Sequence, residues 1–330
     1  MSTGKQKCRK WMLLVREKVN MYKIAIISAY FGPLPNYVKY WMQSAALNGD
    51  IDFYIVNDHA PNKHPTNVHF ISMNLSDFSM LASRKIGLQI QVKEAYKCCD
   101  FKCAFGLIFE DYLREYDFWA HCDLDLVWGD LRKFLNDDVL SQYDKIYPLG
   151  HLALYRNNEM MKRAFMLSGS EKGTYDQIFT SDKHFAFDEL RGIYKILEKN
   201  NIPQYDRYEF ADISPVYSRM KIVTNYTCYS NNYKHQIFVR DGRSIVRYYL
   251  DKKGCVQSDE FAYIHFQKRK FTDEQLIADP NESYIITAKG FFPMRDHKIT
   301  KQLISRYNRY PGKFYEWLEW KDRNYHIIHR

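Results

Sequence analysis

Two aspartates inside an apolar and aromatic run constrain this chain more than any other feature of its sequence. The run, YDFWAHCDLDLVWGDL, covers 116–131 and contains Asp123 and Asp125. Its composition predicts a short buried strand that stops at Gly129. Because alternate residues of a strand share a face, both carboxylates are expected on one side of the sheet, with Leu124 on the other.

Two neighbouring carboxylates repel each other and are costly to remove from water, so they need a proton or a cation between them. Hard oxygen ligands suit Mg²⁺ or Mn²⁺, which keep open positions for water and phosphate oxygens. D-x-D alone is a weak pattern, because most acidic pairs are solvated loops or helix caps. The hydrophobic setting favours a metal site, and the following Gly129-Asp130-Leu131 predicts a helix capped by Asp130.

Length and composition are those of a globular protein with a substantial core. The chain has 330 residues, of which 46% are hydrophobic and 26% charged. Its seven cysteines are odd in number and irregularly spaced, which favours free thiols and a reducing compartment. No apolar run approaches the roughly 18–20 residues that span a bilayer. These features predict a cytoplasmic protein.

Positive charge is concentrated at the two ends of the chain. The net charge is +9; residues 1–20 carry six Lys/Arg and one acid, and residues 291–330 carry nine Lys/Arg and four acids. With Trp11, Trp317 and Trp320 beside them, these ends indicate adhesion to an anionic membrane surface, peripheral on the inner membrane face. Solubilising tails explain the charge equally well, and nucleic acid is not expected as a partner.

The first part of the chain predicts an α/β half that binds nucleotides. Strands are expected at 22–30, 51–56 and 68–71, and a helix at 37–47. The first strand ends in Phe31-Gly32-Pro33, a loop at the carboxyl edge of the sheet, where α/β folds bind ligands. The sequence contains neither Gly-x-Gly-x-x-Gly nor a P-loop lysine, which argues against a dinucleotide site and a P-loop.

The rest of the chain predicts further elements that carry polar side chains. These elements are helices at 80–96 and 97–113, a strand at 146–156, a helix at 185–197, a hairpin at 236–249 and a strand at 261–266. Their polar residues, which an α/β order brings near the D-x-D strand, are Asp100, Lys102, Gly150, His151, Asp188, Glu189, His265, Lys268 and Arg269. Helix caps are an equally good explanation for Asp100, Asp188 and Glu189.

No internal repeat or low-complexity linker interrupts the sequence, so one domain with extensions is expected. The predicted division is a basic N-terminal extension at 1–20, an α/β domain at 21–270 and a basic aromatic C-terminal extension at 271–330.

Four segments, in this order, carry a resemblance to a known family. They are FWAHCDLDLVWGDL, HLALYR, HFAFDE and YIHFQKR. Together they resemble the nucleotide-sugar glycosyltransferases of the GT-A fold, above all bacterial enzymes that build capsular, exopolysaccharide or lipopolysaccharide chains. The resemblance covers about Lys23–Lys270. It implies a single Rossmann-like domain with a mixed, mostly parallel sheet and a basic helical C-terminal extension.

The resemblance implies a metal-dependent hexosyltransferase. Mn²⁺ or Mg²⁺ would bridge the diphosphate of a nucleoside diphosphate sugar, UDP- or GDP-linked, and transfer would go to a glycan or lipid-linked acceptor. Asp125 would ligate the metal directly and Asp123 would hold the ribose or the metal through water. His265 would be the third ligand, unless it is a core histidine. Lys268 and Arg269 would clamp the diphosphate, unless they belong to a solvated charge run.

The same resemblance suggests roles for the remaining candidates. The end of the first strand, with Ala29, Tyr30 and Phe31, would receive the base, which would stack on an aromatic ring. Further contacts to base, ribose or sugar would come from Asp58, Asp100 and Lys102, and the floor under the donor sugar from Gly150 and His151. Asp188, with Glu189 in reserve, would deprotonate the acceptor hydroxyl if the enzyme inverts configuration.

Two other functions compete with this one. Asp123-Leu124-Asp125-Leu126-Val127 also fits the D-x-D-x-[TV] nucleophile loop of haloacid-dehalogenase-type phosphatases, although that motif belongs on the first strand of its domain and here two or three strands precede it. A non-catalytic nucleotide- or sugar-binding relic of the GT-A fold is the other alternative. Retention of His265 and Asp188 together with both aspartates argues against it.

Overall fold

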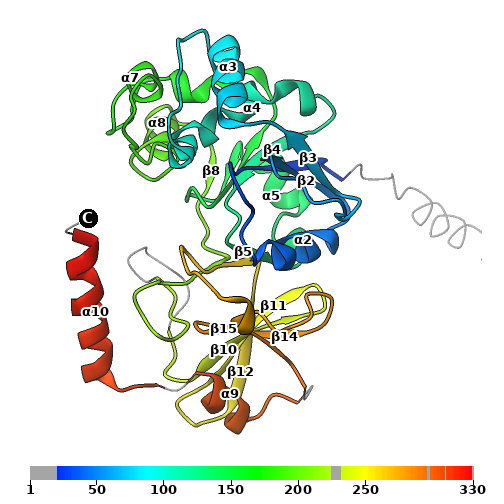
Figure 1. Cartoon of the computed structure of the whole chain (residues 1–330), viewed down its shortest axis with the longest axis vertical. Helices are drawn as coiled ribbons and strands as arrows, with labels where there is room; N and C mark the ends of the chain where they lie inside the picture. Colours follow the sequence, from blue (N-terminus) through cyan, green and yellow to red (C-terminus); the bar gives the residue numbers. More distant parts are fainter. Residues whose placement is uncertain (1–20, 224–231, 296–297, 309, 329–330) are drawn as a thin grey trace, which may run out of the picture.

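The computed structural model describes residues 21–223, 232–295, 298–308 and 310–328. The N-terminal basic extension expected at 1–20 lies outside the described residues. Figure 1 shows an upper part, in which helices surround a large sheet, and a lower part built on a second sheet. A small three-stranded sheet joins the two parts.

The large sheet has seven strands in the order β3-β2-β1-β4-β7-β6-β8. Their bounds are β1 Ile24–Ala29, β2 Ile51–Asn57, β3 Val68–Ser72, β4 Phe118–Cys122, β6 Lys145–Ile146, β7 Leu152–Arg156 and β8 Gln204–Tyr205. Strand β7 runs antiparallel to both of its neighbours, and the other four adjacent pairs are parallel. The expected α/β class with a mixed, mostly parallel sheet is confirmed.

Helices cover both faces of this sheet because the strands alternate apolar residues to both sides. Ile24 and Ile26 of β1 pack in one core with Trp41 of α2, whereas Ala25 and Ile27 pack in the opposite core. The helices of the upper part are α2 Val38–Ala46, α3 Leu75–Ile86, α4 Phe105–Ile108, α5 Asp137–Gln142, α6 Glu159–Arg163, α7 Tyr175–Phe179 and α8 Ile193–Lys199. A strand buried on both faces has a nearly continuous apolar sequence, which makes β1 recognisable from its residues.

The helix expected at 80–96 is wrong in its bounds. Helix α3 begins after Asn74, whose side chain forms a capping box with Asp77, and ends at Gly87, which has a left-handed φ of 81°. The second helix, expected at 97–113, is replaced by the 3₁₀ helix η1 at Ala95–Ala104, the short α4 and the 3₁₀ helix η2 at Glu110–Tyr112. Most of η1 is buried rather than amphipathic, so helical periodicity was a poor guide there.

The strand expected to carry the D-x-D motif is interrupted at that motif. Strand β4 ends at Cys122, and β5, Leu126–Trp128, begins after Asp125. Strand β4 belongs to the large sheet, whereas β5 pairs with β13, Tyr263–His265, in the small sheet. Asp123 and Asp125 therefore lie in a link between two sheets, not on one face of a strand. Asp130 does not cap the following 3₁₀ helix η3, Leu131–Lys133, through its side chain.

Two other expected elements are shorter than predicted. The segment 146–156 contains β6 and β7 with a turn between them, in which Tyr147 has φ 68°. Gly150 and His151 lie in that turn. The helix expected from 185 begins only at Ile193, so Asp188 and Glu189 precede it and are not in its first turn.

The second sheet is antiparallel, with the order β12-β11-β10-β14-β15. Its strands are β10 Gln236–Asp241, β11 Ser244–Leu250, β12 Val256–Phe261, β14 Tyr284–Thr287 and β15 Gly290–Pro293. The hairpin expected at Asp241-Gly242 is confirmed. Strand β14 pairs with β10. The domain boundary expected at residue 270 therefore separates β14 and β15 from the other three strands of the same sheet. Helices α9, Lys301–Tyr307, and α10, Lys313–Ile328, follow it.

The small sheet depends on a close approach at Gly129, which ends β5. A Cβ atom placed there would lie 2.5 Å from the Phe261 carbonyl oxygen and 2.9 Å from that of Ala262. Both atoms are backbone and cannot swing away. We expect Gly129→Ala to lower the free energy of unfolding by about 1–3 kcal/mol in denaturant titrations.

Gly49→Ala is the matched control, because its Cβ would meet nothing closer than Ala46 O at 3.8 Å. It should change stability by no more than about 0.5 kcal/mol. Equal effects of the two substitutions would contradict the close approach at Gly129.

Candidate active site

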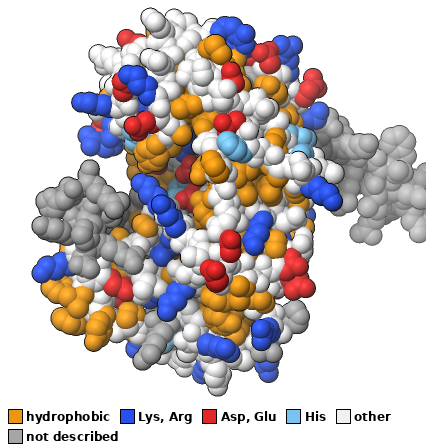
Figure 2. All heavy atoms as spheres, in the orientation of Figure 1, with side chains coloured by type: hydrophobic (Ala, Val, Ile, Leu, Met, Phe, Trp, Pro, Cys, Tyr) orange, Lys and Arg blue, Asp and Glu red, His pale blue; other side chains and the backbone are white. Residues whose placement is uncertain are grey.

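A cavity of about 570 Å³ opens where β1 and β4 end. This is the carboxyl edge of parallel strands, the expected place for a ligand in an α/β fold. Figure 2 shows acidic and histidine side chains at the bottom of a hollow between the upper and lower parts. The polar residues in its wall are Ser28, Tyr30, Tyr37, Tyr96, Cys99, Lys102, Asp123, Asp125, His151, His184, Asp188, Glu189, Asp212, His265, Gln267 and Lys268.

The D-x-D link and His265 meet in this cavity. Antiparallel pairing of β5 with β13 places Leu126 opposite His265, and His265 Nε2 lies 3.3 Å from Asp125 Oδ1. The Lys268 backbone N–H donates to Asp125 Oδ2 at 2.9 Å. One ligand atom from each of Asp123, Asp125 and His265 lies within 4.8 Å of the others.

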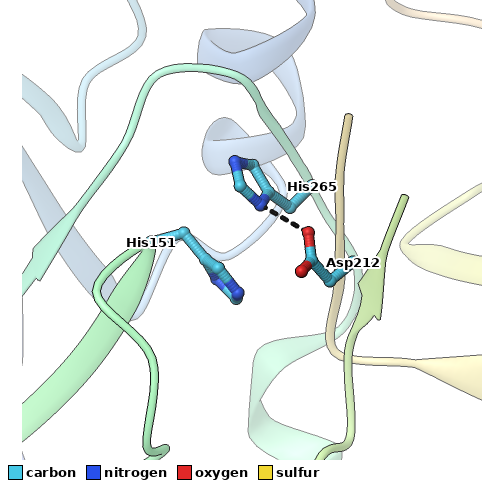
Figure 3. A group of neighbouring side chains, drawn as sticks. All are labelled: His151, Asp212 and His265. Carbon is cyan, nitrogen blue, oxygen red and sulfur yellow. Dashed lines mark hydrogen bonds and ion pairs between the residues drawn. The ribbon is translucent and has the colours of Figure 1, made fainter. Parts of the chain in front are cut away.

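This donor set fits a divalent cation such as Mn²⁺ or Mg²⁺. It offers two carboxylates and one imidazole, and carboxylate oxygens are the ligands that these ions prefer. The second ring nitrogen of His265, Nδ1, lies 2.8 Å from Asp212 Oδ1 (Figure 3). Metal-binding histidines commonly donate their second nitrogen to a carboxylate in this way.

Without a metal, the site balances its charges with a proton on His265. Burial opposes that charge, but Asp125 and Asp212 outweigh burial and raise the pKa of His265 to about 10. Burial also opposes the charge of Asp125, and His265 outweighs it, which lowers the pKa of Asp125 to about 2. The imidazolium therefore occupies the position of a cation between carboxylates.

Lys102 neutralises the other aspartate of the motif. Its Nζ donates to Asp123 Oδ1 at 2.6 Å and to the Gly150 carbonyl at 3.0 Å, and lies 3.2 Å from Asp188 Oδ2. Burial disfavours the charge on Lys102, but chiefly Asp123 outweighs it and holds its pKa well above the usual range. Lys102 is therefore a fixed internal cation.

Asp188 and Glu189 form an acidic pair beside Lys102. A Cβ atom on Gly150 would lie 2.4 Å from Asp188 Oδ2 and 2.8 Å from Glu189 Oε1, so only glycine admits both carboxylates. Burial raises the pKa of Asp188, against the opposing charge of Lys102. Burial and the neighbouring Asp188 raise the pKa of Glu189 to about 7. A carboxylate with a pKa near neutrality suits proton transfer.

His151 lies beside the metal-ligand candidates as a neutral ring. Its Nδ1 is 3.0 Å from the Tyr263 hydroxyl, and its ring centroid is 4.4 Å from that of His265. Nε2 is buried and has no hydrogen-bond partner within the described structure. Burial, and then the charge of His265, lower the pKa of His151 to about 3. Its free nitrogen is available to a ligand.

Part of the cavity wall is aromatic. Ala29, Tyr30 and Phe31, the three residues expected to receive a base, belong to it. Lys268 also lines the cavity, with Nζ 5.5 Å from the centre of the Tyr96 ring. The wall therefore offers flat rings and an exposed cation to a ligand.

Three expected site residues lie elsewhere. Asp58 is outside the cavity and accepts a hydrogen bond from the Gly32 backbone N–H at 3.1 Å. Asp100 is fully buried and accepts from the backbone N–H groups of 185 and 187. Arg269 donates to the carbonyls of 214 and 217. Each of the three residues satisfies backbone groups of a loop.

Several residues of the wall are not among those predicted from the sequence, and Asp212 is the most informative of them. It lies on the two-residue strand β9, Ala211–Asp212, between apolar neighbours. An acid in an apolar segment was the signal that identified the D-x-D motif, and the same signal was present here. The other missed residues of the wall are Tyr37, Tyr96, Cys99, His184 and Gln267.

Comparison with known families gives one match over most of the chain. The model of the Family of unknown function (DUF6625) matches residues 26–295. The chain belongs to this family. Its matched region runs from β1 to the end of β15, so DUF6625 includes the antiparallel sheet as well as the large one. Among proteins with curated functions, none is similar in sequence.

Several solved structures resemble this DUF6625 chain weakly. The galactosyltransferase LgtC with donor and acceptor sugar analogues is 14% identical, with a TM-score of 0.37 over 74% of this chain and 88% of LgtC. The glycosyltransferase GlyE of Streptococcus pneumoniae TIGR4 is 12% identical, with a TM-score of 0.33 over 57% of this chain and 46% of GlyE. A glycosyltransferase that acts in glycosylation of the PBCV-1 major capsid is 9% identical, with a TM-score of 0.30 over 58% of this chain and 84% of that protein.

These TM-scores are too low to assign a function to this DUF6625 chain. Its chemistry has to be inferred from the cavity itself.

The raised pKa of Glu189 predicts a pH-dependent stability. Its folded pKa of about 7 exceeds the usual value for glutamate, so the folded state binds the proton more tightly than the unfolded state, and stability falls as pH rises towards 7. Glu189→Gln removes this cost. We expect the variant to gain on the order of 2 kcal/mol relative to wild type at pH 8, and much less at pH 4.5.

Urea titrations at the two pH values measure this difference. Glu198→Gln, an exposed change on α8, is the control and should show no such pH dependence. A Glu189→Gln effect that is the same at both pH values would contradict the raised pKa.

Proposed function

We propose that this protein is a metal-dependent glycosyltransferase that uses a nucleoside diphosphate sugar as donor. The observation that carries the proposal is the convergence of Asp123, Asp125 and His265 beside the acidic pair Asp188 and Glu189, in one cavity whose wall is partly aromatic. A cation site next to paired carboxylates fits the transfer of a sugar from a diphosphate. The resemblance of the sequence motifs to GT-A enzymes supports the same reaction.

Each residue of the cavity has a proposed role that follows from its position. A bound Mn²⁺ or Mg²⁺ would neutralise the charge that develops on the departing diphosphate, as a Lewis acid. Asp125 and His265 would hold that ion directly, with Asp123 beside them. Lys102 holds the Asp123 carboxylate in place through a hydrogen bond, and Lys268 offers an exposed ammonium group to a phosphate oxygen. Arg269 is not part of the clamp in this proposal, because it binds backbone carbonyls.

Between the two acids, Glu189 is the better candidate for the proton acceptor. Asp188 lies 3.2 Å from Lys102 Nζ, a pairing that stabilises its charge and weakens it as a base. Glu189 has a pKa of about 7 and can take a proton from an acceptor hydroxyl near neutral pH, as an inverting reaction requires. Asp188 and Gly150 would then form the floor under the donor sugar, with His151 Nε2 as a further contact.

A UDP- or GDP-sugar is the proposed donor, with its base against Tyr30 or Phe31. The proposed acceptor is a glycan or a lipid-linked sugar in bacterial surface polysaccharide synthesis, as the resemblance implies. The phosphatase alternative is less well supported, because four strands of a continuous α/β chain, β1 to β4, precede Asp125 and Asp123 is held by Lys102.

Asp125→Ala tests the proposed function. We expect wild-type protein to be stabilised by one class of nucleoside diphosphate only when Mn²⁺ is present, in thermal-shift measurements, and to hydrolyse or transfer the matching nucleotide sugar. The variant should lose the metal-dependent thermal shift, and its turnover should fall at least 100-fold. Replacing a residue that only positions a metal ligand lowers affinity or activity about 10–100-fold, and Asp125 is proposed as a direct ligand.

Asp58→Ala removes a carboxylate outside the cavity and should retain both properties. Full turnover by Asp125→Ala, or stabilisation by no nucleoside diphosphate under any metal condition, would contradict the proposal.

We also propose that α10 docks the enzyme, in the cytoplasm, on the anionic inner face of the membrane where a lipid-linked acceptor lies. The helix stands at the edge of the molecule (Figure 1). Glu316 pairs with Arg219 and Lys221, and Glu319 accepts from the Ser218 backbone N–H, so these two acids face the body. Four of its aromatic residues are 49% to 65% exposed: Phe314, Tyr315, Trp317 and Trp320.

Aromatic rings beside exposed lysines suit a membrane interface. In the part of the chain that the structure describes, no helix is long and apolar enough to cross a bilayer.

Replacing Trp317 and Trp320 together by alanine tests the docking surface. We expect at least a tenfold loss of binding to vesicles containing anionic lipid in co-sedimentation, and no change in turnover of a soluble acceptor. Met80→Ala, which removes an exposed apolar side chain elsewhere, is the control. Unchanged vesicle binding by the double variant would count against this surface.

A further inference from the structure

Asp212 is a buried carboxylate that contacts His265, one of the three candidate metal ligands. It is 3% exposed and lies on β9, which runs parallel to β13 with Asp212 opposite His265. Its Oδ1 is 2.8 Å from His265 Nδ1 and accepts from Gln267 Nε2 at 2.7 Å. Figure 3 shows the carboxylate and the imidazole facing each other across adjacent strands.

This contact decides which nitrogen of His265 faces the cavity. A carboxylate only accepts hydrogen bonds, so the neighbouring Nδ1 must carry a hydrogen. Nε2 is then the atom that points to Asp125, at 3.3 Å. The His151 ring lies against the same imidazole, with ring centroids 4.4 Å apart, and limits its rotation.

We infer that Asp212 is a positioning residue, which holds His265 so that Nε2 presents its lone pair to a divalent cation bound by Asp123 and Asp125. The inference rests on the proposed function and goes beyond it, since it assigns a role to a residue outside the D-x-D and His265 set.

A purely structural role does not explain why a carboxylate occupies position 212. Burying an ionised carboxylate is costly unless it is paired. Within the described ranges, no lysine or arginine lies in ion-pair distance of Asp212, whose one ion-pair contact is His265. An apolar residue would fill this position at lower cost, so the carboxylate is best explained by what it does to the imidazole.

Mn²⁺ affinity without nucleotide, measured by the loss of the free-Mn²⁺ electron paramagnetic resonance signal, tests the inference. We expect Asp212→Ala to bind Mn²⁺ about 10–100-fold more weakly than wild type. Asp212→Asn, which keeps an oxygen that can accept from Nδ1, should lose less. His265→Ala should be weakened at least as much as Asp212→Ala. Because Asp212 acts through His265, adding either Asp212 substitution to His265→Ala should cause no further loss.

Asp144→Asn is the control for a lost carboxylate, because Asp144 pairs with Arg156 outside the cavity; it should bind Mn²⁺ as wild type does. Wild-type affinity in Asp212→Ala and Asp212→Asn, or an equal loss in the His265→Ala background, would overturn the positioning role alone. If Asp212→Ala does not fold, Asp212→Asn in the two backgrounds decides the question. Failure of wild-type protein to bind Mn²⁺ would overturn the proposed function and the inference with it.

Discussion

The structure around the cavity depends on neutralising two carboxylates where the chain crosses between sheets. Asp123 and Asp125 follow β4 and precede β5, and each meets a different internal cation. Lys102 holds Asp123 at 2.6 Å, and His265 faces Asp125 at 3.3 Å. A buried lysine cannot leave its site, whereas an imidazolium can exchange its proton for a metal ion. The first cation is therefore structural and the second is the one that a ligand can replace.

This division of roles explains how distant parts of the chain combine in one site. The large sheet leads into the D-x-D link at the end of β4, and the residues after its strand β1 supply Tyr30 and Phe31 of the cavity wall. The small sheet supplies His265, through pairing of β5 with β13, and Asp212, through pairing of β9 with β13. Gly129 permits the close backbone contact on which that small sheet depends. A substitution that disturbs these strand pairings would move His265 relative to Asp123 and Asp125 even though all three residues are unchanged.

Sequence reasoning succeeded where one physical signal dominates. Strands β1, β2 and β3 are predictable because short segments rich in β-branched and aromatic residues favour strands. The D-x-D strand was predicted as continuous because its composition is uniform, and only pairing with β13 shows that it divides. Asp58 and Asp100 are predicted as ligand contacts, and in the structure they accept hydrogen bonds from backbone N–H groups. Such partners are set by tertiary contacts, and a single sequence does not contain them.

The central claim is that Asp123, Asp125 and His265 form a divalent-cation site that holds a nucleoside diphosphate. Anomalous diffraction from crystals grown with Mn²⁺ and UDP, and separately with GDP, tests it most directly. We expect one manganese peak in direct contact with Asp125 and His265 Nε2, with diphosphate oxygens completing its coordination and the base beside Tyr30. Nucleotide bound in this cavity with no manganese peak beside those residues, or manganese bound only elsewhere, would contradict it.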